Sequence, residues 1–109
     1  MPGAPQRKQS KPEGEFHEST DYSTGRRTVF HEINVPNPIP GEPHAIRAQA
    51  TETGKNQWSV KVHHGPHAER DPSGSYYKHV EQFTHEGPIG TLRNTLKRTT
   101  GQQFKGLRP

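Results

Sequence analysis

The sequence predicts an α+β domain in which a small, curved antiparallel sheet of about four strands carries one C-terminal helix on its apolar face. The first observation behind this prediction is a series of segments that alternate apolar and polar residues between turn-forming glycines and prolines. The second is a single segment near the C-terminus whose apolar residues recur at helical spacing. The third is size, because 109 residues with 24% hydrophobic residues allow one domain at most, with a thin core.

The predicted strands cover residues 26–35, the two arms of a hairpin within 44–62, and residues 75–85. In the first three strands the apolar residues alternate with polar ones and share one face. This face holds Val29, Ile33 and Val35 together with His31, then Ile46, Ala48 and Ala50, and then Trp58, Val60 and Val62. We expect the apolar half of the hairpin to form the core, with Trp58 as its largest side chain. Both faces of 75–85 are mixed, so the sequence leaves the orientation of this strand open.

Residues 87–109 contain the helix signal. A glycine and Pro88 suit a helix start, since proline lacks the N–H that the first turn leaves unpaired. The apolar residues that follow at spacings of three and four, and so share one face, are Ile89, Leu92 and Leu96. Gly101 is the predicted end of the helix, because glycine is the usual left-handed C-cap. Such a helix packs its apolar side on the sheet and presents its charges to a partner.

The domain boundaries follow from composition. Residues 1–25 are predicted to be a flexible basic and polar N-terminal arm, since they are rich in proline, glycine and polar residues and offer little that can pack. Residues 26–101 then form the α+β domain, and residues 102–109 form a basic C-terminal tail.

Charge is distributed unevenly along the chain. The net charge of +4 combines +3 on residues 1–12, −4 on residues 13–86 and +5 on residues 87–109, and neither terminal segment contains an acidic residue. Basic extensions on a small domain are typical of nucleic-acid binding, because each lysine or arginine that meets a phosphate releases a counterion. The alternative is that the basic ends only keep the protein soluble.

The leading functional prediction is a non-enzymatic protein that binds RNA or single-stranded DNA through the C-terminal helix and tail and the N-terminal arm. The predicted contact residues are Arg93, Lys97, Arg98, Lys105, Arg108, Arg26, Arg27, Lys61, Tyr76 and Tyr77. Arg47 extends the basic set across the sheet, and Phe30 and Phe83 are further stacking candidates. The alternative for each aromatic residue is packing in the core or in a dimer interface.

Eight histidines allow a second function, a small, metal-independent, histidine-dependent ribonuclease similar to the small basic toxin nucleases, which are built on comparable sheets. This reaction needs a base, an acid and a cation near the phosphate. His63 and His85 on neighbouring strands, with Lys61 or Arg93 nearby, are the candidate set. The remaining possibility is that the histidines are solvated or contact phosphate. We expect no metal site, since neighbouring histidines on a strand point to opposite faces, and no other cofactor.

A third alternative is a subunit of a larger assembly such as a virion, with arms that order on neighbouring subunits. A thin core also favours a homodimer, since association buries additional apolar surface. The chain has no cysteine and so offers no disulfide and no thiolate metal ligand. It has no apolar run of membrane-spanning length, so we expect a cytoplasmic protein without a membrane partner. The residues around Ser73–Ser75 form no phosphate-binding loop, and no nucleophile elbow or HExxH pattern is present.

Overall fold

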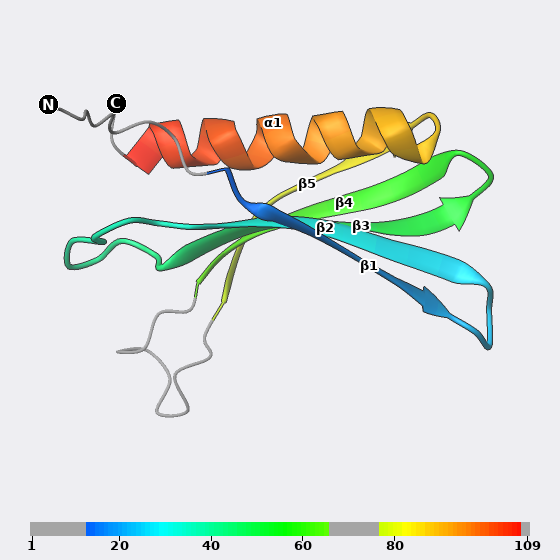
Figure 1. Ribbon diagram of the computed structural model, residues 1–109, viewed down its shortest axis with the longest axis horizontal. Helices are drawn as coiled ribbons and strands as arrows, with labels where there is room; N and C mark the ends of the chain where they lie inside the picture. Colours follow the sequence, from blue (N-terminus) through cyan, green and yellow to red (C-terminus); the bar gives the residue numbers. More distant parts are fainter. Residues whose placement is uncertain (1–12, 66–76, 108–109) are drawn as a thin grey trace, which may run out of the picture.

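The computed structural model describes residues 13–65 and 77–107, and this part of the chain forms one sheet and one helix (Figure 1). The elements are β1 (Glu15–Asp21), β2 (Arg26–Asn34), β3 (Ala45–Gly54), β4 (Gln57–Gly65), β5 (Lys78–Glu86) and α1 (Ile89–Leu107). The strands make an open antiparallel sheet in the order β1-β2-β3-β4-β5. The predicted α+β class is therefore confirmed, with five strands instead of about four.

The additional strand is β1, which lies within the segment predicted to be a flexible arm. It pairs with β2 from Glu15, opposite Glu32, to Asp21, opposite Arg26. A turn closes the hairpin, in which the amide of Gly25 donates to the carbonyl of Asp21 (2.6 Å) and Gly25 adopts a φ of 79°. Strand β1 is almost entirely exposed, so backbone pairing and turn chemistry form it without the apolar pattern on which strand prediction depends.

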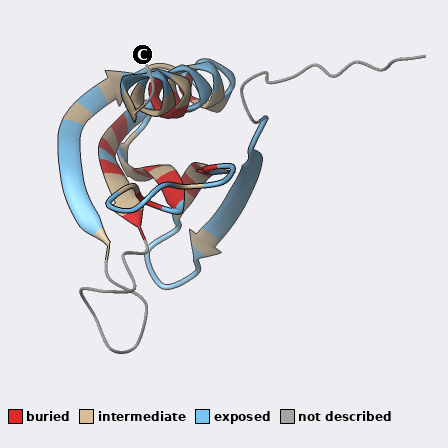
Figure 2. Ribbon diagram, turned by 90° about the vertical axis from the view of Figure 1, so that its left-hand side faces the viewer, coloured by how far each residue is buried: buried red, intermediate tan, exposed pale blue. Residues whose placement is uncertain are grey.

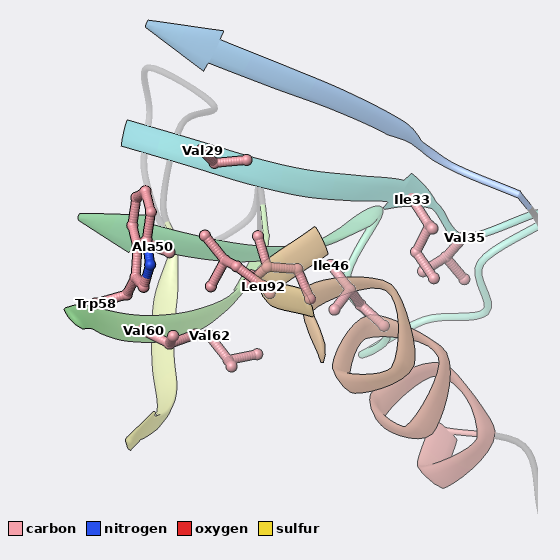
Figure 3. Packing of buried hydrophobic residues seen from close by; sticks show 11 residues of the cluster. Val29, Ile33, Val35, Ile46, Ala50, Trp58, Val60, Val62 and Leu92 are labelled. Atoms are coloured by element: carbon pink, nitrogen blue, oxygen red, sulfur yellow. The ribbon is translucent and has the colours of Figure 1, made fainter. Parts of the chain in front are cut away.

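The apolar faces of β2, β3 and β4 meet under the helix, as the alternation predicts. Figure 2 shows the sheet curving toward α1, and Figure 3 shows the buried side chains between the two layers. The buried cluster consists of Val29, Ile33, Val35, Ile46, Ala48, Ala50, Trp58, Val60, Val62, Leu92 and Leu96. Trp58 is 1% exposed, so its predicted place in the core is confirmed. We call the other face of the sheet, which points away from α1, the open face.

The register of β5 settles the orientation that its sequence leaves open. Phe83 lies opposite Val60 and packs against the buried cluster, so it belongs to the helix-facing side. A register shift in the β4–β5 pairing beside His63 marks an irregularity of the β-bulge type. The strand spans Lys78–Glu86, and residues 75 and 76 of the predicted strand lie outside the described residues.

The start of α1 is fixed directly on the end of β5. The amides of Thr91 and Leu92 donate to the carbonyl of Pro88 (3.0 and 3.1 Å), as expected for proline in a first turn. The indole N–H of Trp58 donates to the carbonyl of Gly87 (3.1 Å). The core tryptophan therefore also anchors the junction between strand and helix.

The helix continues past its predicted end. Gly101 lies inside α1, which ends at Leu107, so the prediction of a C-cap at Gly101 and of a separate tail from residue 102 is wrong for 102–107. A glycine inside a helix costs about 1 kcal/mol relative to alanine. Phe104 and Leu107 pack against the buried cluster, and this additional burial offsets the cost of the glycine.

A buried histidine links three parts of the fold. His31 is 2% exposed, and its Nε2 lies 3.0 Å from the carbonyl oxygen of Glu13. A carbonyl only accepts, so Nε2 carries a proton and Nδ1 of the neutral ring can accept from the hydroxyl of Thr100 (2.7 Å). The hydroxyl has a single proton, which it donates either to Nδ1 or to the carbonyl of Lys97 (3.1 Å). Neutral His31 thus connects Glu13, two residues before β1, to β2 and α1.

We expect Leu96→Ala to reduce the free energy of unfolding by about 2–5 kcal/mol, since Leu96 is 0% exposed in the helix–sheet contact. Urea unfolding followed by circular dichroism measures the change. The control is Asn94→Ala on the exposed side of the same helix, for which we expect no loss. Equal effects of the two changes would contradict the described packing.

Stability should also fall in acid because of His31. Burial lowers the pKa of His31 below its usual 6.5, and the positive charge of Lys97 adds to this effect. The unfolded chain therefore binds the proton more readily than the folded protein, and the free energy of unfolding decreases as pH falls below about 6.5. Thermal unfolding between pH 5 and 8 should show this decline, and His31→Gln should make it shallower. His44→Gln, at an exposed position, should leave it unchanged.

Candidate nucleic-acid interface

The outward side of α1 is the most uniformly basic surface element among the described residues. Its 19 residues contain no Asp or Glu. The residues opposite the buried leucines, spaced so that they share one side, line a shallow surface hollow: Asn94, Lys97, Arg98, Gly101, Gln102 and Lys105. We call this the helix face. It combines three cations with two amide side chains that can donate hydrogen bonds.

Two of the predicted helix cations form ion pairs with residues at or next to β1. Arg93 Nη2 lies 3.2 Å from Glu18 Oε1, and Lys97 Nζ lies 3.7 Å from Glu13 Oε1. Both pairs are well exposed, and such pairs contribute only about 0–1 kcal/mol each. Within the described part of the chain, Arg98 and Lys105 belong to none of the ion pairs. The structure therefore brings Lys97, Arg98 and Lys105 together on the helix face, with Arg93 at its β1 side.

The predicted contacts outside the helix are dispersed. Arg27 faces the helix side of the sheet, where its guanidinium makes two hydrogen bonds to Glu52 (3.2 and 3.1 Å) and lies 5.3 Å from the ring of Trp58. The hydrogen bonds with Glu52 raise the pKa of Arg27. Arg27 is thus occupied by a structural ion pair. Arg26 is exposed and lies opposite Asp21 in the sheet register. Arg108 and Tyr76 lie outside the described residues, as do the cations of 1–12.

The open face carries a stack of planar side chains that sequence reasoning missed. The guanidinium of Arg47 lies over the ring of Phe30 (4.4 Å to the centroid) and over the ring of Tyr77 (5.3 Å). The ring of His17 stacks on Phe30 at 4.8 Å and 27°. Arg47 Nη2 also contacts Glu32 at 3.3 Å, whereas its buried Nε has no hydrogen-bond partner among the described residues. The alternation places Phe30 and Arg47 on polar faces, but only the β2–β3 register makes them neighbours.

The two histidines of the ribonuclease hypothesis are not brought together. His63 lies on the open face, where its ring is 5.5 Å from that of His79. His85 lies opposite Trp58, on the helix side, and its ring contacts the hydroxyls of Thr91 (3.1 Å) and Thr95 (3.4 Å). The sheet thus separates His63 from His85, and these two residues do not form the acid–base pair that the hypothesis requires.

The electrostatic surroundings of His63 are cationic. Burial lowers its pKa below 6.5, and the nearby His79, Arg47 and Lys61 lower it further. Lys61 is exposed on the same face. This part of the open face therefore disfavours an additional proton unless an anion is present.

No metal centre is apparent in the described ranges, since no group of three or more His, Cys, Asp or Glu side chains there is arranged to hold an ion. His64 points to the helix side and contacts Gln103 (2.9 Å), while His63 points to the open face. His67, the third histidine of the cluster in the sequence, lies outside the described residues. No helix in 13–65 or 77–107 has the length and hydropathy needed to cross a membrane.

Comparisons of the chain with protein-family models, curated proteins and solved structures found no match.

Proposed function

We propose that the protein is a non-enzymatic binder of RNA or single-stranded DNA, and that the helix face of α1 contacts the phosphate backbone. The observation that carries this proposal is the helix face itself, on which Arg98 and Lys105 stand exposed in a helix without acidic residues. Unpaired cations on a rigid element favour a polyanion, because binding releases counterions without first breaking a strong internal ion pair.

The side chains of the helix face are better suited to contacts with phosphates than to recognition of individual bases. Lys97, Arg98 and Lys105 are cations, and Asn94 and Gln102 between them add neutral donors, as is typical of backbone-positioning contacts. The helix face has no aromatic residue on which a base can stack. Binding through it should therefore depend strongly on salt and weakly on base sequence.

The weak pairs at β1 do not oppose this function. Arg93 and Lys97 meet their glutamates at exposed positions, where solvent screens the attraction. A phosphate that approaches the helix face can replace Glu13 as the partner of Lys97 at little cost. The same exchange at Arg93 would extend the contact surface toward β1.

Removing single cations from the helix face should lower the salt dependence of binding. We expect Lys105→Gln and Arg98→Gln each to reduce the slope of log affinity against log salt by about 0.7, the contribution of one phosphate contact on a single strand. Fluorescence anisotropy with labelled single-stranded RNA and DNA at several salt concentrations measures the slope. The matched control is Lys55→Gln, an exposed lysine in the β3–β4 turn.

Two outcomes would contradict the proposal. If Lys55→Gln changed the slope as much as Lys105→Gln, binding would follow net charge and not the helix face. If the recovered RNA were shortened after incubation in the presence of chelator, the protein would be a nuclease. A gel of the RNA after each titration distinguishes binding from cleavage.

A further inference from the structure

The register of β3, β4 and β5 assembles a second polar surface on the open face. Three cross-strand rows run across these strands, and each row takes one residue from each strand. The rows are Arg47–His63–His79, Gln49–Lys61–Gln82 and Thr51–Ser59–Thr84. We call these nine residues the donor grid. Neighbouring strands are about 4.8 Å apart and successive rows about 6.8 Å apart along a strand, so the grid covers an area comparable with a short segment of a single nucleic-acid strand.

The chemistry of the donor grid is uniform. Each of the nine side chains can donate a hydrogen bond, and none is acidic or aliphatic. Lys61 occupies the centre and is exposed. On the open face, Glu15, Asp21 and Glu32 belong to β1 and β2, at the other half of the sheet. The β3–β5 half has one acidic residue on this face, Glu86, which lies opposite Gln57 at the end of β5, outside the nine residues. The open face is thus polarised, and its β3–β5 half offers donors and positive charge.

The edge of the grid is held in place before any ligand arrives. Arg47 contacts the rings of Phe30 and Tyr77 and the carboxylate of Glu32, so little side-chain freedom remains to be lost on binding. The ring of Tyr77 is only half-buried. Aromatic rings of this kind stack on unpaired bases, which a duplex does not present.

We propose that the donor grid is a second nucleic-acid contact surface, which binds the backbone of a single strand with proton uptake at His63 and with a base against Tyr77. This inference rests on the proposed function, because it takes the ligand to be nucleic acid. It adds the preference for single strands that the helix face, which has no stacking residue, does not supply.

A second copy of the chain is the less favourable occupant of this face. Two donor grids facing one another in a symmetric dimer would bring Arg47 and Lys61 close to their own copies. Like charges that are directly opposed destabilise such a contact. An anionic ligand meets the same groups with complementary charge.

Proton uptake follows from the groups around His63. The neighbours of His63 are Arg47 from β3, Lys61 on its own strand and His79 from β5. Glu32 contacts Arg47 and, in this row, no other residue. Burial and these neighbours lower its pKa, so the free protein keeps His63 neutral at pH 7. A phosphate in contact favours the charged imidazolium. Affinity should therefore rise as pH falls from 8 to 6.

The experiment uses the full chain and a labelled single-stranded oligonucleotide, with salt and pH both varied. Lys61→Gln should lower affinity about fivefold at 0.1 M salt, the loss expected for one phosphate contact. His63→Gln should remove most of the rise in affinity between pH 8 and pH 6. The matched controls are Lys55→Gln and His44→Gln, which change the same residue types at exposed positions outside the grid. Circular dichroism confirms that each variant is folded.

The outcomes separate this inference from the proposed function. If Lys105→Gln weakens binding while Lys61→Gln and His63→Gln behave as the controls, the donor grid is overturned and the helix face stands. If Lys61→Gln and His63→Gln act while Lys105→Gln does not, the grid stands and the helix face is overturned. Absence of binding at low salt at every pH overturns both. If Lys61→Gln alters the oligomeric state in sedimentation without changing nucleic-acid affinity, the face binds a second copy and the inference is wrong.

Discussion

The contact between one helix and the curved side of one sheet determines most of this structure. Leu92 and Leu96 bury fully against side chains of β2, β3 and β4, and the chain offers no other described helix to cover that surface. The hydrogen bond from Trp58 to Gly87 fixes where α1 begins. With one side of the helix committed to the core, the helical period leaves Arg98 and Lys105 on the outside. The position of the cations is thus a consequence of the packing.

The same constraint explains why the two candidate surfaces lie on opposite sides of the molecule. A sheet covered by helix on one side only leaves its other face to polar side chains. Here that face is partly organised by contacts of its own, since His17, Phe30, Arg47 and Tyr77 stack across it. The helix face offers charge without planar groups, whereas the open face combines both. A flexible strand long enough to pass around the edge of the sheet could reach both surfaces, but a rigid duplex could not.

Local patterns in the sequence predict the core more fully than they predict the surfaces. Alternation identifies the buried side of β2, β3 and β4, and helical spacing identifies Leu92 and Leu96. In both cases the buried residues are apolar and recur at the period of the strand or of the helix. The sequence of strand β1 has no such apolar pattern, since the strand is exposed and forms through backbone pairing and its turn. Helix α1 passes Gly101 because Phe104 and Leu107 contact the core, which local propensity does not include. The separation of His63 from His85, and the assembly of the donor grid, depend on strand register, which no single segment contains.

The tie around His31 has a consequence for how the sequence can vary. A Cβ placed on Gly14 would lie 2.5 Å from Ile33 Cγ2 and 2.6 Å from His31 Cε1, and Gly14 already has a φ of 79°. Any other residue at this position must move one of those side chains or release the chain before β1 from the sheet. Thr100 shares the same histidine. We therefore expect Gly14, His31 and Thr100 to change together among related chains.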